Sequence, residues 1–141
     1  MPMQNFADHT IAISKEYGGI SNLKLQKVLY FALGQYIRDN GINDLVRDIY
    51  TERFEAWQYG PVIKSEYHRN KHFGRYNIRR EAQIHENYND LNDYIIKNLN
   101  RSVTDLVEDS HSRPTWSTNR EAILSNQIVT YDLRDLQNDF S

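Results

Sequence analysis

Apolar side chains recur every three or four positions in long stretches of this chain, which is the spacing of helices with one buried face. The clearest stretch begins at Ser21, a residue type that caps helix N-termini. It ends at Asn40-Gly41, where glycine can adopt the left-handed conformation of a helix end. Its apolar positions are Leu25, Leu29, Ala32, Leu33, Tyr36 and Ile37. We predict that this segment is the central helix of the core.

Helical spacing also appears in five other segments, four of which lie next to a helix cap or a helix breaker. They are 6–17 before Gly18-Gly19, 62–72 before Gly74, 88–100, 102–113 between Ser102 and Pro114, and 130–140 with Thr130 as its N-cap. The first of them carries Phe6, Ile13 and Tyr17 on its apolar face. In contrast, residues 42–52 predict a loop or short turn, and residues 75–87 predict an irregular segment.

A period of two replaces the helical spacing in residues 53–59. Phe54 and Ala56 alternate there with Glu55, Trp57 and Tyr59, which predicts a short strand. The next two residues, Gly-Pro, end this strand, because proline lacks a ladder donor and its fixed φ suits the first position of a following helix. The sequence therefore predicts a mainly α, compact, single-domain helical fold over residues 1–141, with a small β element around residues 53–59.

The composition narrows the cellular setting. The 141 residues include no cysteine, which excludes disulfides and thiolate metal sites and indicates a reducing compartment. No apolar run approaches the ~20 residues that cross a bilayer. The N-terminus lacks the basic and apolar regions of a secretory signal. The sequence therefore predicts a cytoplasmic protein without a membrane partner.

Charge is distributed unevenly along the chain. The net charge is −2, yet residues 62–80 carry six cations and only one carboxylate, that of Glu66. The cations are Lys64, Arg69, Lys71, Arg75, Arg79 and Arg80. Tyr67, Phe73 and Tyr76 lie between them. Three interpretations fit this segment: a solvated helix face, a docking surface for an acidic protein, and a nucleic-acid site. The acidic total charge disfavours nucleic acid.

Catalytic and metal-binding patterns are weak. His68 and His72 are four residues apart on a predicted helix, but no third ligand follows and their neighbours are basic. Residues 109–112 contain aspartate, serine and histidine, yet adjacent helical residues point about 100° apart, so Ser110 and His111 cannot act as nucleophile and base. We predict no enzymatic activity, no metal and no cofactor. The two tryptophans, Trp57 and Trp116, fit either the core or an interface.

Three blocks of the sequence resemble the Panacea antitoxin domain, the SocA-like, phage-associated group. The first block is 20–32 and the second, most specific one is 54–62. The third places a histidine shortly before proline and tryptophan. The matching residues are Leu25, Gln26, Lys27, Leu29, Tyr30, Phe54, Ala56, Gly60, Pro61, Val62, His111, Pro114 and Trp116. Order and separation match the family over about residues 5–140.

The resemblance implies an antitoxin of a bacterial or prophage toxin–antitoxin pair. Members of this family neutralise diverse toxins, small alarmone-synthetase-like enzymes among them, by direct protein binding, and we expect this chain to occlude the functional site of its toxin. We accordingly expect a cognate protein toxin encoded by an adjacent gene. A proteolytic adaptor that delivers a toxin to a protease, and a nucleic-acid-binding regulator that uses residues 62–80, are the alternatives. Candidate partner-binding residues are Trp57, Tyr59, Lys64, Tyr67, Arg69, Lys71, Arg75 and Tyr76.

Overall fold

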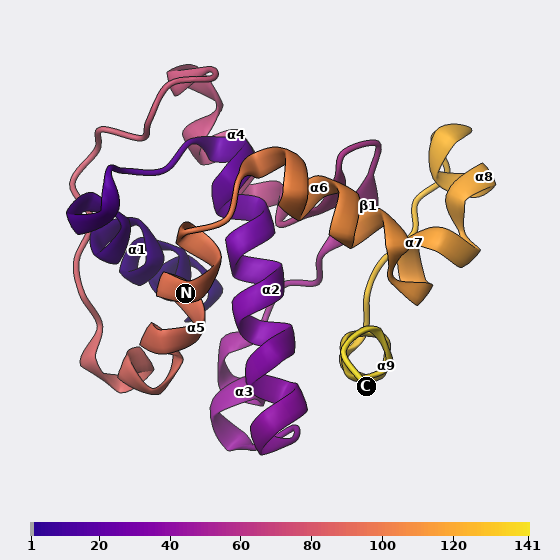
Figure 1. Cartoon of the computed structure of the whole chain (residues 1–141), viewed down its shortest axis with the longest axis horizontal. Coiled ribbons are helices and arrows are strands. Elements are labelled where there is room, and N and C mark those ends of the chain that lie inside the picture. Colours follow the sequence, from indigo (N-terminus) through magenta and orange to yellow (C-terminus); the bar gives the residue numbers. More distant parts are fainter. Residues whose placement is uncertain (1) are drawn as a thin grey trace.

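Helix α2 (Asn22–Asn40) runs through the middle of the molecule in a computed structural model that describes residues 2–141 (Figure 1). Both predicted ends are confirmed. The Ser21 side chain accepts a hydrogen bond from the Lys24 amide, and Gly41, at φ 75°, donates its amide to the Ile37 carbonyl. All side chains from Leu25 to Ile37 are buried. The helix is therefore covered on every side, not only along its apolar stripe.

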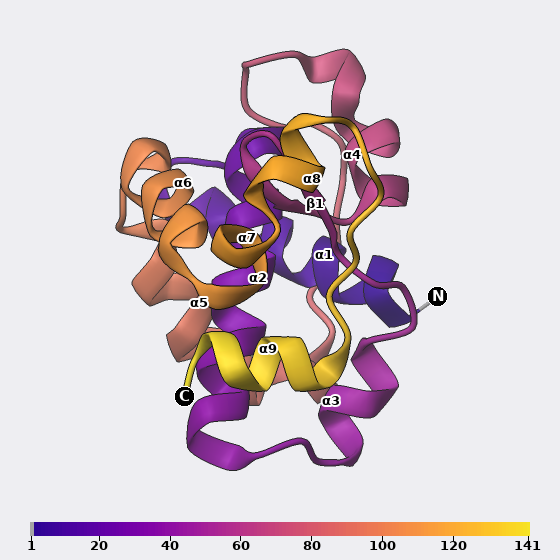
Figure 2. The same cartoon turned by 90° about the vertical axis from the view of Figure 1, so that its right-hand side faces the viewer.

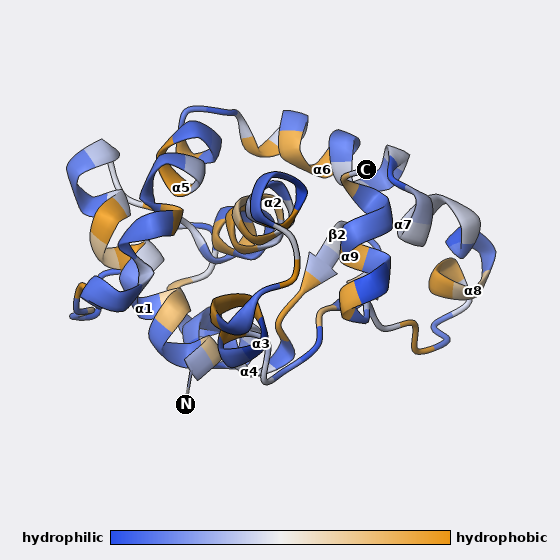
Figure 3. Cartoon of the chain, turned by 90° about the horizontal axis from the view of Figure 1, so that it is seen from below, coloured by the Kyte–Doolittle hydropathy of each residue, from blue (hydrophilic) through white to orange (hydrophobic). Residues whose placement is uncertain are grey.

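Several other helices pack around α2, as the end-on view in Figure 3 shows. Helices α1 (Pro2–Ser14) and α5 (Asn92–Leu99) pack on one side, and α6 (Val103–Ser112) and α9 (Leu133–Asp139) pack on the other. Shorter helices are α3 (Asp44–Ile49), α4 (Lys64–Asn70), α7 (Pro114–Thr118) and α8 (Arg120–Leu124), with 3-10 helices η1 (Lys15–Tyr17), η2 (Lys71–Phe73) and η3 (Glu86–Leu91). Of these, α7 and α8 lie farther out from α2, beyond α6 and α9. The predicted mainly helical fold is confirmed, and none of these helices is long and apolar enough to cross a membrane.

The β element is an antiparallel hairpin of β1 (Glu55–Trp57) and β2 (Gly60–Val62). The first strand ends at Trp57, before Gly60-Pro61, but the prediction that a helix follows directly at Pro61 is wrong, because these two residues begin β2. Pro61 pairs with Ala56 in the register, at a position whose N–H the ladder does not use. Gly60 has φ +106°, which permits the tight turn at residues 58–59. Helix α4 begins only at Lys64.

A third extended segment lies beside β1. The amide of Ala56 donates to the carbonyl of Val129 (2.8 Å), and the amide of Tyr131 donates to the carbonyl of Phe54 (3.0 Å). In Figure 2 this segment runs from α8 past β1 to α9. The prediction that Thr130 caps the last helix is wrong, because Thr130 pairs with Glu55 instead. Asp132 is the N-cap, in a capping box with Asp135.

Two further predictions need correction, and several others are confirmed. Residues 42–52 are not only a loop, because α3 forms there with Asn43 as its N-cap. Tyr17 is 45% exposed and does not belong to the apolar face of the first helix. Gly18 ends that helix segment at φ 93°, and Ser102 caps α6. The segment predicted as irregular, 75–87, contains no helix or strand up to residue 85, and its last two residues begin η3. Pro114 follows α6 as predicted, but it opens α7, which the sequence pattern does not predict.

Candidate functional site

Side chains from the first and third sequence blocks hold the hairpin by its backbone carbonyls. From α2, Lys27 Nζ donates to the Pro61 carbonyl at 2.8 Å. At the α6–α7 corner, His111 Nε2 donates to the Gln58 carbonyl and Trp116 Nε1 donates to the Trp57 carbonyl, both at 2.9 Å. Two segments that are distant from the hairpin in sequence therefore fix it at both ends of its turn.

A second contact from α2 fixes the exit of the hairpin. The side-chain oxygen of Gln26 accepts a hydrogen bond from the Ile63 amide at 2.8 Å, and its amide nitrogen donates to Asn22 Oδ1 at 3.1 Å. Gln26 is 1% exposed, so both of its amide atoms are paired in the interior. This contact sets the direction in which the chain leaves β2 and enters α4.

Lys27 is a buried amine without an acidic partner. Its side chain is fully buried, and among residues 2–141 no ion pair reaches it. Burial lowers the pKa of Lys27 to about 7, since the low-dielectric interior disfavours the charged amine. Gly60 leaves the room that this amine needs. A Cβ at Gly60 would lie 3.1 Å from Lys27 Cε and 2.5 Å from Ser110 Oγ.

His111 takes its orientation from two contacts. Its ring stacks on Trp116, and the Gln58 carbonyl requires a proton on Nε2. Burial lowers the pKa of His111, the hydrogen bond to Gln58 opposes this shift, and the charge of Lys27 lowers the pKa further. Ser110 does not face this ring, because Ser110 Oγ donates to the Val107 carbonyl. His111 is thus engaged with the hairpin and not with a neighbouring nucleophile.

The turn that these contacts hold is exposed. Tyr59 at its tip is 57% exposed. Three hollows surround the turn, and Gln58 lines all of them. Two of them, with volumes of about 430 and 400 Å³, are also lined by Tyr59. Aromatic side chains supply contact area at low entropic cost, so an aromatic-tipped turn between hollows is a candidate recognition surface.

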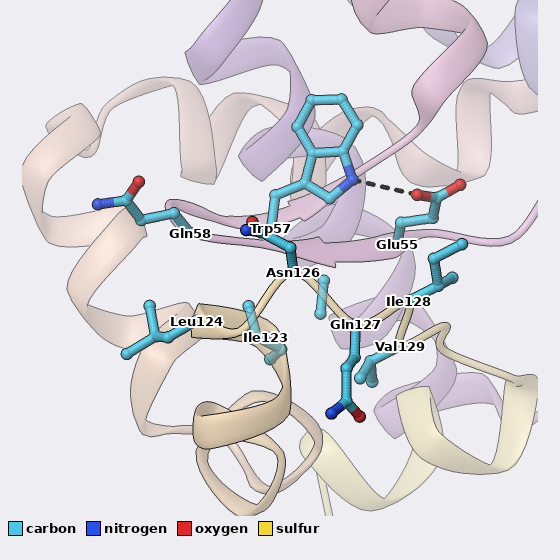
Figure 4. A pocket seen from close by; sticks show the side chains of 10 residues that line it. Glu55, Trp57, Gln58, Ile123, Leu124, Asn126, Gln127, Ile128 and Val129 are labelled. Atoms are coloured by element: carbon cyan, nitrogen blue, oxygen red, sulfur yellow. Dashed lines mark hydrogen bonds between the residues drawn. The ribbon is translucent and has the colours of Figure 1, made fainter.

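The first hollow, the α8 groove, is bordered by β1, α8 and residues 126–129 and has a volume of about 460 Å³ (Figure 4). Ile128 at its edge is 82% exposed. The Trp57 ring lies on the opposite face of the strand from Ile123 and Leu124 (Figure 4). There Trp57 Nε1 donates to Glu55 Oε1 at 3.2 Å. The groove is thus lined by residues 55–58, by Ile123 and Leu124 of α8, and by residues 126–129, which follow α8.

The second and third hollows lie against the turn. The Trp116 hollow is lined by Gln58, Tyr59, His111, Trp116, Ser117, Arg120 and Leu124. The Tyr67 hollow is lined by Asn22, Leu23, Gln26, Trp57, Gln58, Tyr59, Val62, Tyr67, Lys71 and Gly74. Arg120, Leu124 and Leu23 are not among the sequence-predicted site residues. Arg120 and Leu124 belong to α8, which carries too short an apolar pattern to be predicted.

The predicted partner-binding residues separate into three groups in space. Four of them line the Tyr67 hollow: Trp57, Tyr59, Tyr67 and Lys71. Lys64, Arg75 and Tyr76 are exposed outside the three hollows, with the Arg75 guanidinium 5.4 Å from the Tyr76 ring centre. Arg69 is held inside the protein by ion pairs with Asp8 and Glu66. Its charge is already neutralised, and we leave it out of the proposed interface.

Most of the other motif residues belong to the core. Leu25, Leu29, Tyr30, Phe54, Ala56 and Val62 are buried, and the Tyr30 hydroxyl donates to Asp139 at 2.8 Å. No group of three or more metal-ligating side chains occurs among residues 2–141, and His68 and His72 are both exposed. The motif residues therefore support the hairpin, and the aromatic and cationic side chains that could contact another molecule lie around its turn.

Comparison with known proteins adds an independent finding. Residues 25–117 match the family described as "Antitoxin SocA-like, Panacea domain". A stretch of 43 residues is 51% identical to antitoxin SocA of Caulobacter vibrioides (strain NA1000 / CB15N), covering 30% of this chain and 20% of that relative. No solved structure matches the chain significantly. The matched range contains the hairpin and all the side chains that hold its carbonyls.

Proposed function

The chain belongs to the SocA-like Panacea antitoxin family, and on that premise we propose that it neutralises a protein toxin by binding it directly and covering the toxin's functional site. Family membership supports an antitoxin role and a toxin as partner. Direct binding is the mode that the exposed turn favours, since Tyr59 projects from a backbone held by Lys27, His111 and Trp116.

One observation carries this proposal. The residues matched by the family include the whole hairpin and its supports, yet the turn itself points to solvent. A buried framework that maintains an exposed turn lets related proteins keep one fold and vary the side chains that meet a partner. The proposed interface therefore comprises Tyr59 and the Tyr67 and Trp116 hollows, and the proposed toxin is the product of an adjacent gene.

Co-expression tests the proposal. The neighbouring open reading frame is induced alone and together with this chain, and growth and co-purification are scored. We expect growth arrest by the neighbour alone, and rescue with a stable complex when both are present. Tyr59→Ala should weaken rescue and complex formation, whereas Tyr17→Ala, which replaces an exposed tyrosine outside the three hollows, should not.

The same experiment separates occlusion from delivery to a protease. Under occlusion, the toxin persists at unchanged half-life while its activity is lost, whereas an adaptor shortens that half-life. Rescue without a complex, or a complex that leaves the toxin active, would overturn direct occlusion.

A further inference from the structure

The two hollows beside the turn have similar linings, because each contains aromatic rings and one cation. Trp57, Tyr59 and Tyr67 line the Tyr67 hollow, where the Trp57 and Tyr67 ring centres are 4.9 Å apart. Tyr59 and Trp116 line the Trp116 hollow, where the His111 ring stacks on Trp116. Each hollow has one permanent cation, Lys71 in the first and Arg120 in the second. No carboxylate is among the lining residues of either hollow.

Both cations are available to a partner. Lys71 and Arg120 are exposed, and within residues 2–141 neither of them forms an ion pair. Arg69 and Arg80 differ, since Asp8 and Glu66 neutralise them inside the protein. Lys71 and Arg120 therefore place positive charge beside the turn and next to aromatic rings.

We propose that the partner segment that docks on this face is an acidic peptide segment with an aromatic or large apolar anchor. The anchor enters the Tyr67 hollow against Trp57 and Tyr67, and carboxylates of the same partner surface pair with Lys71 and, across the turn, with Arg120. This inference rests on the proposed function and specifies the chemistry of the toxin surface that is bound.

Charge and geometry both favour this occupant. An aromatic anchor that fills a pocket supplies most of the energy of many interfaces, and a carboxylate beside it gains from a cation that is desolvated on docking. A nucleic acid fits less well, because phosphate binding draws on several cations along a backbone path. Here each hollow supplies one cation, and the chain has a net charge of −2.

A peptide selection tests this without knowledge of the toxin. The purified full-length chain is panned against a displayed library of random twelve-residue peptides, and the dissociation constants of enriched peptides are measured. We expect peptides in which aspartate or glutamate flanks tryptophan, phenylalanine or leucine. Lys71→Glu should weaken them about tenfold or more, equal to about 1.4 kcal/mol or more. Arg120→Glu should weaken them as well, and Tyr67→Ala should remove the aromatic preference.

Lys97→Glu is the matched control, since it makes the same charge change on an exposed lysine of α5 that lines none of the hollows. Thermal unfolding verifies that each variant is folded. Lys71→Met serves as a second variant that removes the cation without adding a carboxylate. Enriched peptides without acidic residues, equal binding by the Lys71→Glu and Lys97→Glu variants, or no enrichment at all would each overturn the inference.

Failure of this inference differs from failure of the proposed function. A wild-type chain that neutralises the neighbouring toxin, together with a Lys71→Glu/Arg120→Glu double variant that does so with equal affinity, would overturn the acidic-partner inference alone. A wild-type chain that forms no complex with that toxin would overturn the proposed function, whichever peptides are enriched. Restored binding between the double variant and a toxin with lysine at an interface carboxylate would support both.

Discussion

The imidazole of His111 stacks on the indole of Trp116, with ring centroids 3.9 Å apart and ring planes 27° apart. Both rings donate to consecutive carbonyls of the hairpin, His111 to Gln58 and Trp116 to Trp57. The α6–α7 corner and the hairpin are thereby joined through a pair of side chains that are only five positions apart. This relationship makes the conformation of the turn depend on the third sequence block.

His111→Ala should destabilise the protein by about 1–3 kcal/mol, because the substitution removes a hydrogen bond and an aromatic contact together. His111→Phe keeps the aromatic contact with Trp116 and should therefore lose less stability than His111→Ala. Urea unfolding monitored by circular dichroism measures both variants. His68→Ala, at an exposed histidine, is the control. An unchanged midpoint for His111→Ala would show that the turn does not depend on this contact.

Gly60→Ala should destabilise the protein by about 1–3 kcal/mol, since alanine is strained at φ +106° and its Cβ would meet Ser110 Oγ at 2.5 Å. The measurement is the midpoint of thermal or urea unfolding. Gly18→Ala is a matched control, because Gly18 has φ +93° with nothing within 4 Å of its added Cβ. The stability lost in Gly18→Ala therefore measures the cost of backbone strain without a steric clash.

The difference between these two variants isolates the close approach of the hairpin to α2 and α6. Ser110→Ala should recover part of the loss in the Gly60→Ala background, because it removes the nearest clashing atom. Equal losses for Gly60→Ala and Gly18→Ala, with no recovery, would mean that the hairpin is not packed as closely as described.

Stability should rise with pH between about 7 and 9.5, with Lys27 as a main contributor. In the unfolded chain Lys27 keeps its proton up to its ordinary pKa of 10.5, whereas burial lowers the pKa to about 7 in the folded protein. Between these values the folded state binds fewer protons, so deprotonation favours folding. The expected result is a larger free energy of unfolding at pH 9.5 than at pH 7, measured by urea titration.

The Lys27→Met variant tests whether Lys27 causes this increase of stability with pH, the slope of the free energy of unfolding against pH. The variant should lose most of the pH dependence, while the Pro61 carbonyl loses its donor at a cost of about 1–3 kcal/mol. Lys97→Met, at an exposed lysine, should retain the wild-type slope. A Lys27→Met protein with the full wild-type slope would contradict the buried, unpaired state of this amine.

Leu29→Ala should cost about 2–5 kcal/mol of stability, because Leu29 is fully buried at the centre of α2 and the substitution leaves a cavity. Ile84→Ala removes a comparable side chain that is 51% exposed and should change stability by less than about 0.5 kcal/mol. Equilibrium unfolding in urea measures both. A small loss for Leu29→Ala would refute the central role of this helix.

An element could be predicted from the sequence when the interactions that determine it lie within a few residues of it. The limits of α2 could be predicted because Ser21 and Gly41 act on groups three or four residues away. The second strand could not be predicted, since a proline is acceptable there only because its missing N–H faces away from the ladder. Helices α7 and α8, with five residues each, are too short for a periodic pattern to appear.

The sequence by itself determined a helical protein with a buried central helix, a β element near residue 55, and the family motifs that identify it. Only the tertiary structure decided which polar side chains are paired inside the protein and which line a hollow at its surface. Arg69 and Lys71 are two residues apart in one basic segment, yet Asp8, 61 positions away, neutralises the first, and the second lines a hollow. The physical reason is range: caps and periodicity act within one helical turn, whereas charge pairing and exposure depend on segments that only the folded chain brings together.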